Sequence, residues 1–498
     1  MRASASLPGS RRAVVIGAGL GGLAAAIRLQ AGGIETVVVE ARDAPGGRAG
    51  CDSEAPFRFC GGPEALSDRS ALEELWALSG TAVEHDIALY PVTPLRRHSW
   101  PDGTTFDLHA DEAELTREVA RLAPGDLAGH EEYQRLSRSI LADFRSRPGP
   151  EPFTDLRALS GMMSQLARAQ AWRSLWSLIC AHVHDERLRE VLAVGALQQG
   201  ANPLAVSALM AADTARMRAG LWWPQGGFAA LAAALQKRFE QLGGTVRLGD
   251  PVCRVHTLGN RVHEIETQGG WKSRCDVLIS TADRDHTWRD LLAETRRGEE
   301  MAARTRRQPH APGLFTVHFA LEGTWPGIPH SMALFGPRFR ALIEDITIHG
   351  VLPQDQLIWL CHPSLTDPSL APPGKSVFRA QVPVANLARL PIDWEAIGPL
   401  LEQRVLAEIG RRLVPDIRDR LITAHHITPR DLALDFNAAQ GSGFGLAAQP
   451  LWHARAFHPL RDKGLGNLYF AGAAAAPGGG LPGALSSAKA ATTMILTE

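Results

Sequence analysis

A glycine-rich turn near the N-terminus constrains the fold of this chain more than any other stretch. It reads Gly17-Ala18-Gly19-Leu20-Gly21-Gly22 and lies between a short apolar run, AVVIG at 13–17, and a segment of helical composition, LGGLAAAIRLQAGG. A second apolar run, TVVVE at 36–40, follows the helical segment. Strand, glycine turn, helix and strand within about 30 residues predict a βαβ unit of an α/β fold.

Three glycines of the turn match G-x-G-x-x-G, which in this context is typical of dinucleotide binding. Gly17 permits the tight turn, Gly19 lets the backbone approach a pyrophosphate, and Gly22 lets the helix pack close to the strand. The N–H groups at the start of the helix then face the phosphate charge. Glu40 ends the second strand, where its carboxylate is placed to accept hydrogen bonds from a ribose diol.

The residues after Glu40 indicate which dinucleotide is bound. EARDAPGGRAG at 40–50 places Gly46, Gly47 and Arg48 just past the acidic residue. A guanidinium there pairs with phosphate oxygens, and two glycines let the backbone pass beside the cofactor. This pattern resembles the FAD-binding start of the amine oxidase and carotenoid desaturase superfamily, which favours FAD over NAD.

Further strands of similar character come much later in the chain, at Thr245–Val255, Arg261–Thr267 and Cys275–Thr281. With 498 residues, the chain also exceeds what one hydrophobic core usually serves. We therefore expect a discontinuous Rossmann-like FAD-binding domain and an inserted α+β substrate domain with a helical segment. The predicted FAD-binding domain comprises residues 1–90, 215–285 and 425–498, and the predicted substrate domain comprises residues 91–214 and 286–424.

The predicted substrate domain contains a β-sheet that forms one side of it. Strand-like runs occupy 313–321, 356–363 and 376–385. A helix follows, because apolar residues recur at every fourth position, at Ile397, Leu401, Val405 and Ile409.

Composition excludes several classes of partner. The formal net charge is -1, so no long-range field favours nucleic acid. Six cysteines show neither a C-x-x-C pair nor metal-ligand spacing, which indicates reduced thiols in a cytosolic setting. The start, MRASASLPGSRR, has no apolar region typical of a signal peptide, and no run approaches the ~18 apolar residues that span a bilayer. We expect a protein that is soluble or lies on a membrane surface.

Later stretches resemble one family closely. FCGGPEALSD at 59–68, WWPQGGFAALAAALQKRFEQLGG at 222–244 and SMALFGPRFRALIEDI at 331–346 are similar to segments of the phytoene desaturase-type carotenoid oxidoreductases. ITPRDLALDFNAAQGSGFGL at 427–446 and RDKGLGNLYFAGAAAAPGGGLPGALSSAKAA at 461–491 resemble that family's C-terminal pattern. The resemblance covers almost the whole chain.

The resemblance implies non-covalent FAD, an elongated apolar tunnel for a C30 or C40 polyene, and FAD-dependent desaturation of a linear carotenoid precursor such as phytoene. A membrane quinone or oxygen would be the electron acceptor. The residues implied to bind FAD are Gly17, Ala18, Gly19, Gly22, Glu40, Arg48, Gly62, Val252, Thr281, Gly472, Leu481 and Gly483. The helix that starts after Gly483 would point at the flavin, where its dipole stabilises negative charge.

Two alternatives stay open. One is another flavoenzyme of the superfamily, either a carotenoid isomerase or an amine oxidase-like enzyme; only three tyrosines exist for an aromatic cage. The other is a lipid-binding module without redox chemistry, as in Rab GDP-dissociation inhibitors. The complete set of glycines with Glu40 and Arg48 argues against that module.

The segment Leu156–Val183, which contains Trp172 and Trp176 with only arginine as its charge, has two interpretations. It is either a buried core helix or a monotopic face on the inner side of the cell membrane, where a carotenoid precursor is collected.

The chain departs from the family pattern at three places. Cys60 stands where the family usually has Asp, Thr281 where it often has Asn, and Ala474-Ala475-Ala476 where Gly-Thr-His is common. We therefore expect a difference from lycopene-forming relatives in substrate, in the number of desaturation steps or in isomer specificity, with loss of activity as the alternative.

No residue is singled out as the catalytic base. Glu64, Arg338 and Asp431 are candidates that we expect to be structural or solvent-facing. We also expect no metal at the histidine pairs His182/His184 and His425/His426.

Overall fold

The computed structural model describes residues 11–145, 163–448, 459–473, 475 and 480–498. A parallel five-stranded sheet gathers strands from distant parts of the chain, in the order β19-β13-β1-β2-β9. Their bounds are β19 (Leu468–Phe470), β13 (Val277–Ser280), β1 (Arg12–Ile16), β2 (Glu35–Val39) and β9 (Thr245–Arg247). The valine-rich runs of β1 and β2 are buried on both faces, as expected of a parallel sheet covered by helices. The predicted strands at both ends of the glycine turn are confirmed.

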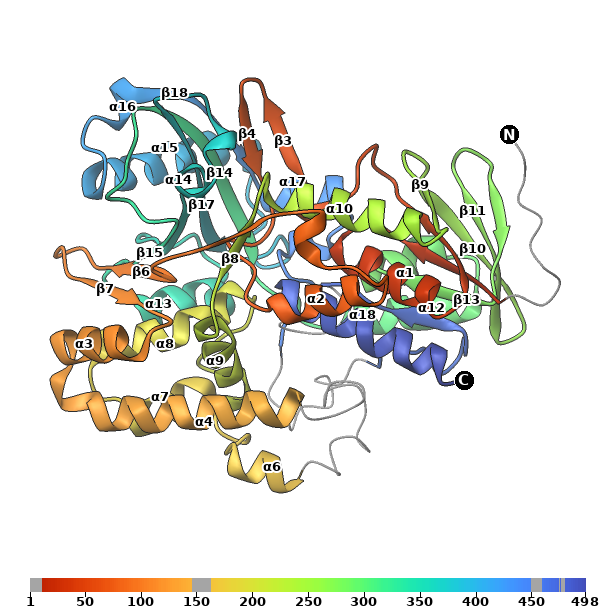
Figure 1. Cartoon of the computed structure of the whole chain (residues 1–498), viewed down its shortest axis with the longest axis horizontal. Coiled ribbons are helices and arrows are strands. Elements are labelled where there is room, and N and C mark those ends of the chain that lie inside the picture. The colour runs from red at the N-terminus through yellow and green to blue at the C-terminus, as the bar shows by residue number, and fades with distance from the viewer. Residues whose placement is uncertain (1–10, 146–162, 449–458, 474, 476–479) are drawn as a thin grey trace.

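Three helices cover this sheet: α1 (Leu20–Ala31), α10 (Gly227–Gln241) and α18 (Gly480–Leu496). Helix α1 packs against both of the others (Figure 1). Gly21 permits the close approach at the start of α1, because a Cβ there would lie 2.7 Å from the Cα of Gly472. The glycine turn therefore also sets how closely the last helix approaches the first.

The run Thr245–Val255, predicted as one strand region, belongs to two different sheets. β9 joins the parallel sheet, whereas β10 (Val252–Leu258) pairs with β11 (Arg261–Thr267), which pairs with β12 (Lys272–Arg274). Gly249, with a φ of +66°, and Pro251 lie between β9 and β10. The left-handed glycine and the missing N–H of proline explain the break.

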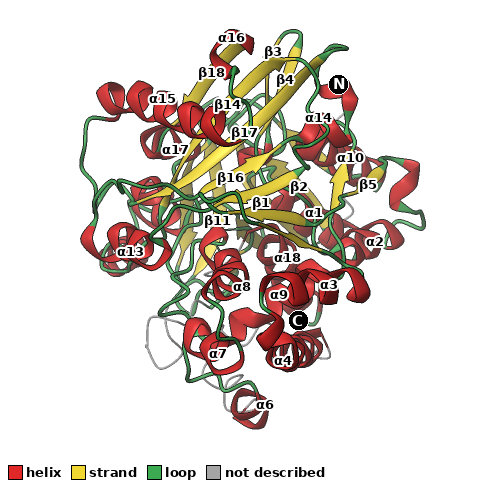
Figure 2. Ribbon diagram, turned by 90° about the vertical axis from the view of Figure 1, so that its left-hand side faces the viewer, coloured by secondary structure: helices red, strands yellow, loops and turns green. Residues whose placement is uncertain are grey.

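A seven-stranded mixed sheet is the second large element, in the order β18-β14-β17-β16-β15-β6-β7. Its strands run through the middle of Figure 2. All neighbours are antiparallel except β15 and β6. The bounds are β18 (Leu421–Ile427), β14 (Gly313–Glu322), β17 (Lys375–Val384), β16 (Ile358–Cys361), β15 (Ser331–Leu334), β6 (Arg96–Ser99) and β7 (Thr105–Leu108).

Helix α15 (Trp394–Arg412) covers one face of this sheet. Of its four predicted apolar positions, Leu401, Val405 and Ile409 are buried, in a core that includes Phe315 and Phe378. Since side chains alternate along a strand, the neighbouring residues of β14 and β17 point to the opposite face. That second face is the one that lines the functional cavity described below.

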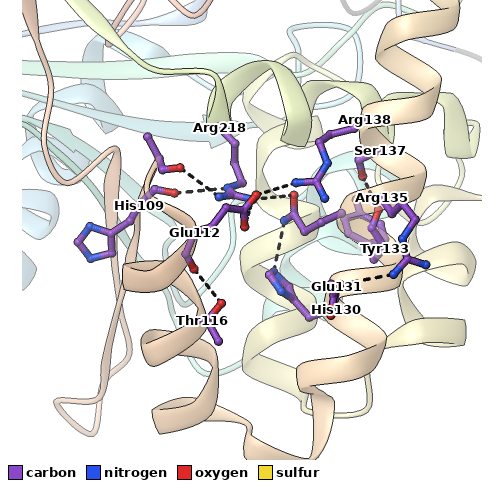
Figure 3. Close-up of polar contacts among 12 residues, drawn as sticks. His109, Glu112, Thr116, His130, Glu131, Tyr133, Arg135, Ser137, Arg138 and Arg218 are labelled. Atoms are coloured by element: carbon purple, nitrogen blue, oxygen red, sulfur yellow. Dashed lines mark hydrogen bonds and ion pairs between the residues drawn. The ribbon is translucent and has the colours of Figure 1, made fainter.

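A helical region lies below the seven-stranded sheet in Figure 1. It contains α3 (Glu112–Leu122), α4 (Leu127–Arg145), α6 (Met163–Arg168), α7 (Leu175–His182), α8 (Glu186–Gln198) and α9 (Ala212–Arg218). Figure 3 shows Arg218 at the junction of α3, α4 and α9. Its three guanidinium nitrogens donate to the carbonyls of His109 and Ala110, to the Glu112 carboxylate and to the side-chain oxygen of Gln134.

The described part of the Trp-, Leu- and Arg-rich segment is partly exposed and partly packed against the core. Residues 156–162 lie outside the described residues. Met163 and Trp172 are 63% and 60% exposed, whereas the Trp176 ring centroid lies 6.2 Å from that of Phe339, within the core. Among the described residues, no helix is both long and apolar enough to cross a membrane.

The remaining short strands and helices lie outside the two large sheets. The short strands are β3 (Cys51–Glu54), β4 (Phe57–Cys60), β5 (Leu89–Pro91) and β8 (Trp222–Pro224). The further helices are α2 (Arg69–Ala77), α11 (Arg284–His286), α12 (Arg296–Thr305), α13 (Phe339–Glu344), α14 (Pro363–Thr366), α16 (Ile417–Arg420) and α17 (Pro429–Phe436).

The expectation that all cysteines are reduced is wrong for one pair. The β3–β4 hairpin places Cys51 directly opposite Cys60, and the structure joins them in a disulfide. They lie nine positions apart, a spacing that matches no local cysteine motif. Strand register brings the two side chains together, so the sequence carried no signal for the bond.

Candidate cofactor and substrate cavity

One cavity of about 730 Å³ connects the glycine turn with the seven-stranded sheet. All but two of the twelve residues predicted to bind FAD line it: Gly17, Gly19, Gly22, Glu40, Arg48, Gly62, Val252, Thr281, Gly472 and Leu481. The two exceptions are Ala18, which is buried behind the turn, and Gly483, which lies inside α18. The contacts themselves remain predictions, but the structure brings these distant segments to one place.

The glycine turn has the shape that close backbone approach requires. Gly17 has a φ of +99°, and a Cβ on Gly22 would lie 2.0 Å from the Gly17 carbonyl oxygen. A Cβ on Gly19 would meet nothing within 4 Å, so this position opens onto free space. No side chain caps the start of α1 at Gly19. Its first N–H groups are therefore suited to an anion.

Glu40 is held rigidly by the backbone around it. Its Oε2 accepts the Ala18 N–H at 2.6 Å, and its Oε1 accepts the Arg42 N–H at 3.0 Å. A carboxylate has about four acceptor positions, so each oxygen still has capacity for a ribose hydroxyl. Ala18 thus contributes by orienting Glu40 rather than by lining the cavity.

The Gly46-Gly47-Arg48 stretch runs beside the first glycine turn. The Gly46 N–H donates to the Ala18 carbonyl at 2.9 Å, and a Cβ on Gly47 would lie 3.6 Å from the Gly19 Cα. Arg48 lines the cavity and donates from Nη1 to the Gly443 carbonyl at 2.6 Å. Burial lowers the pKa of Arg48 from its ordinary value, an effect that Asp283 opposes.

Thr281 has a structural role as well as a place in the cavity wall. Its hydroxyl donates to the carbonyl of Ile16 at 2.7 Å. A Cβ on Gly17 would lie 2.4 Å from the Thr281 hydroxyl oxygen. The late strand β13 is thereby fastened to the end of β1. A threonine at this position stabilises the turn whether or not it also contacts a cofactor.

The C-terminal segment reaches the cavity at Gly472, Leu481, Pro482 and Ala484. The predicted helix after Gly483 begins earlier, at Gly480. Pro482 fits there because N–H groups of the first helical turn have no intrahelical partner. Of the alanine triplet, Ala474 and Ala476 lie outside the described residues. Ala475 is buried, and its carbonyl accepts from Arg284 Nη2 at 2.9 Å.

These features fit a flavin dinucleotide. The open space at Gly19 faces an uncapped helix start, which suits a pyrophosphate, and Glu40 retains acceptor capacity for a ribose. Gly472, with a φ of +90°, lines the same cavity, so no Cβ separates its backbone from a ring placed there.

The far wall of the cavity is a sheet face that sequence analysis did not identify. Thr316 and His318 of β14, Trp359 of β16, and Arg379 and Gln381 of β17 line it. Alternating polar residues in a strand usually indicate a solvent-facing side. Here the alternation in SVFRAQV marks a buried cavity wall, and no local signal distinguishes the two cases.

Glu64 is the only one of the three candidate bases that lines the cavity. It is 5% exposed, its Oε2 accepts from Arg96 at 3.0 Å and from the Ser331 hydroxyl at 2.6 Å, and Arg96 also donates to Gln198. Its Oε1 has no hydrogen-bond partner among the described residues. Of the two expected roles, structural or solvent-facing, the burial and ion pair of Glu64 fit the structural one.

The other two candidates are structural, as expected. Arg338 is exposed and pairs with Asp345 and Asp355. Asp431 completes a capping box with Thr428 at the start of α17. Neither lines the cavity.

Histidines beside the cavity are neutral near pH 7. Burial lowers the pKa of His330 to about 4 and that of His318 well below its ordinary value, where Arg379 and His425 add to the effect. Burial also raises the pKa of the Cys361 thiol to about 12. The permanent charges of this region therefore belong to arginine and carboxylate side chains.

Within the described part of the chain, no three His, Cys, Asp or Glu side chains gather as a metal site would require. His184 contacts Asp126, and His182 lies 3.6 Å from Glu132. His426 contacts Glu402, while His425 stacks on His318.

Comparisons with known proteins cover almost the whole chain and agree on a flavin-dependent oxidoreductase. The family model described as flavin containing amine oxidoreductase matches residues 20–496. The chain is 36% identical to a phytoene desaturase (lycopene-forming) of a Paracoccus species, over 99% of both chains. It is also 36% identical to a phytoene desaturase (lycopene-forming) of Pantoea ananas, over 97% of this chain and 99% of the relative. An oxidoreductase from Methanosarcina mazei shares the fold, with a TM-score of 0.65 at 16% identity, covering 98% and 100% of the two chains.

Proposed function

The chain belongs to the flavin-containing amine oxidoreductase family, and we propose that it catalyses the FAD-dependent desaturation of a linear carotenoid precursor such as phytoene. One observation carries this proposal: a single cavity joins the dinucleotide turn at Gly17 and Gly19 to the buried sheet face around Trp359. Full-length similarity to phytoene desaturases supports the same reaction on CH–CH bonds.

When bound, FAD supplies a two-electron acceptor that takes hydride from an allylic carbon. The chain's own residues bind and orient the cofactor and the substrate. We propose that the predicted residues hold the cofactor, ten of them from the cavity wall, Ala18 by orienting Glu40, and Gly483 from within α18. We also propose that the predicted division into an FAD-binding and a substrate domain follows the two large sheets. All five strands of the parallel sheet come from the predicted FAD-binding segments, and six of the seven strands of the other sheet lie wholly within the predicted substrate segments, with β18 crossing the boundary.

An apolar substrate is oriented by shape and burial, at about 25 cal/mol per Å² of apolar area. Leu221, Met217, Leu314, Trp359 and Ile427 supply apolar cavity wall. Of the three candidate bases, Glu64 is the one that lines the cavity, and its Oε1 has no hydrogen-bond partner among the described residues, so we propose it as the acceptor for the proton that leaves the neighbouring carbon.

The reaction is tested with FAD-loaded protein and phytoene in lipid vesicles, under oxygen or with added quinone. We expect products that are lighter by two hydrogens for each step, with longer-wavelength absorption, resolved by chromatography and mass spectrometry. A product of unchanged mass but altered double-bond geometry would instead identify an isomerase. Phytoene recovered unchanged with both acceptors would contradict the proposed reaction.

We further propose that the protein lies on the inner face of the cell membrane and collects its substrate there. The exposed Met163 and Trp172 support this, since interfacial proteins present large apolar and aromatic side chains to lipid. Vesicle flotation of the variant Met163→Ser/Trp172→Ala should fall below that of the unaltered protein. Leu258→Ser removes an equally exposed apolar side chain from the distant β10 and is the matched control. Unchanged flotation of the double variant would contradict membrane contact through this segment.

A further inference from the structure

The disulfide between Cys51 and Cys60 belongs to the cavity wall. Cys51 is partly exposed and lines the cavity, and so do its neighbour Gly50 and the two residues that follow Cys60, Gly61 and Gly62. Cys60 itself is 4% exposed. One half of the disulfide is therefore open to the cavity, and the other half is buried.

The hairpin that carries the disulfide lies between the two ends of the cavity. Towards the dinucleotide turn, Gly50 donates its N–H to the carbonyl of Gly47 at 3.1 Å, and Gly47 passes beside that turn. Towards the seven-stranded sheet, the Cys60 carbonyl accepts from Arg379 of β17 at 2.9 Å. A flavin ring that takes hydride from a substrate has to lie between these ends, because the phosphates fit the turn and the substrate fits the sheet face. We therefore expect the disulfide to lie beside the ring.

A purely structural role explains this disulfide poorly. It closes a loop of only nine positions, whose ends β3 and β4 already hold together, and short loops gain least from a cross-link. On the inner face of the membrane, proposed above, thiols are kept reduced. Disulfides found in such a compartment are usually transient and serve catalysis or redox sensing.

The other four cysteines are of a different kind. Cys180, Cys253, Cys275 and Cys361 are free thiols, and none of them lines the cavity. Burial raises the pKa of Cys275 and that of Cys361 to about 12, so both thiols stay protonated and unreactive near pH 7. The disulfide is thus the one cysteine pair of this chain that is placed for redox chemistry at the cavity.

We propose that Cys51 and Cys60 form a redox-active pair that exchanges two electrons with the bound flavin. The inference rests on FAD binding in the proposed function and adds a second two-electron site beside the cofactor. In the forward step the reduced flavin gives up two electrons and a proton, the S–S bond breaks, and a second proton comes from solvent, which yields oxidised flavin and two thiols. The reverse step returns the electrons through the flavin to oxygen or a quinone and restores the disulfide.

This pair doubles the number of electrons that one protein molecule holds. FAD accepts one electron pair and the disulfide accepts another. Two successive desaturation steps are then possible before an external acceptor is needed.

Anaerobic reductive titration tests the inference without requiring phytoene. Dithionite is added stepwise to FAD-loaded protein while the flavin absorbance is recorded. We expect full reduction to take about twice the amount that the FAD content accounts for, because the disulfide takes the second electron pair. After a first, limiting addition, the flavin absorbance should fall and then partly return as electrons move to the disulfide.

Thiol counting identifies the acceptor. Alkylation followed by mass spectrometry should label four cysteines in protein purified in air and all six after reduction. Cys51→Ser/Cys60→Ser should take only the reductant that its FAD accounts for, about half that of the unaltered protein. Cys180→Ser removes a free thiol of α7 and should match the unaltered protein. FAD content and the thermal midpoint of each variant show whether it is folded.

Several results would overturn the inference. One is a titration in which the unaltered protein takes only the electron pair of its FAD, and this result needs no variant. Others are six alkylated cysteines in protein purified in air and an undiminished electron capacity in the double variant. Reduction of the disulfide without a transient loss of flavin absorbance is a further one, since the electrons would then bypass the flavin.

Anaerobic incubation with phytoene is read separately. Without an external acceptor, the unaltered protein should complete about two desaturation steps for each FAD, and the double variant about one. Phytoene recovered unchanged, together with a second electron pair in the titration, would contradict the proposed reaction and leave the redox pair in place. Desaturation by a protein that takes a single electron pair would contradict the redox pair alone.

Discussion

Two buried arginines of this protein have opposite surroundings. Arg218, in the helical region, donates from all three guanidinium nitrogens to protein acceptors (Figure 3). Arg379, on the cavity face of the sheet, donates to one carbonyl and has two unpartnered nitrogens. Since buried polar groups in folded proteins are normally satisfied, the first arginine is explained by the fold and the second is not. The difference separates an arginine whose nitrogens all have protein acceptors from one that the fold satisfies only in part.

The largest expected effect comes from a variant that leaves a third buried arginine, Arg96, without its counterion. Arg96 is buried but paired with Glu64. Glu64→Gln keeps the side-chain shape and removes the negative charge, leaving Arg96 without a counterion. We expect a loss of about 3–5 kcal/mol in the free energy of unfolding, measured by denaturant or thermal unfolding.

The double variant Glu64→Gln/Arg96→Met is the control for that loss. With both charges gone, most of the stability should return, because an ion pair replaced as a whole costs little. If the double variant were as unstable as the single one, shape rather than charge would explain the result, and the comparison of buried arginines would fail.

The next effect tests Arg218 itself. Arg218→Met leaves the carbonyls of His109 and Ala110 and the Gln134 oxygen without their donor. Losing several hydrogen bonds at a buried junction should cost about 2–3 kcal/mol, read as a lower thermal midpoint. Glu112 adds little, because its side chain is largely exposed and also pairs with Arg138.

The matched variant is Arg379→Met, which removes a buried arginine that has only one acceptor. Its free energy of unfolding should change by less than about 1 kcal/mol, because the lost hydrogen bond is offset by removal of an unpaired charge. Equal destabilisation by the two variants would show that both arginines are structural.

The smallest effect concerns pH and a carboxylate of the helical region. Glu190 of α8 is buried and accepts from the Trp100 indole at 2.6 Å. Burial raises the pKa of Glu190 from 4.5 to about 7. The folded state therefore binds this proton more tightly, so the contribution of Glu190 to stability is fully present below pH 4.5 and is lost as pH rises through about 7. We expect a contribution on the order of 2 kcal/mol.

Glu190→Gln cannot titrate, so its difference in stability from the unaltered protein should change between pH 5 and pH 8. Glu131→Gln, at an exposed position of α4, is the control and should track the unaltered protein. Parallel curves for the Glu190 variant and the unaltered protein would contradict the raised pKa.

Residues with local signals were predictable, and residues placed by distant strands were not. The turn at Gly17, the carboxylate of Glu40 and the strands β1, β2, β11, β14 and β17 follow from spacing and periodicity within short windows. Arg379 alternates with apolar neighbours in FRAQV, a pattern that also describes a solvent-facing strand edge. Only the pairing of β17 with β14 and β16 shows that its polar side faces a cavity.

The same reason explains the unforeseen disulfide and the early start of α18. Cys51 and Cys60 meet because β3 and β4 pair in one register, and register depends on the hairpin as a whole. Helix α18 begins at Gly480, before Pro482, although a proline usually indicates a helix boundary. A proline is tolerated there because a residue of the first helical turn has no intrahelical hydrogen bond to lose. Each case depends on context that a short window does not contain.

The position of β19 and α18 has a consequence for how the protein is made. β19 is the outer neighbour of β13, and Gly472 with Leu481 forms the cavity wall across from the first turn. Ribosomes add about 5–20 residues per second, so the N-terminal turn emerges roughly 20–90 seconds before this wall exists. β13 is complete about 190 residues before β19, so for roughly 10–40 seconds one edge of β13 lacks its partner strand. The wall that would complete the cofactor site is therefore the last part of it to be made.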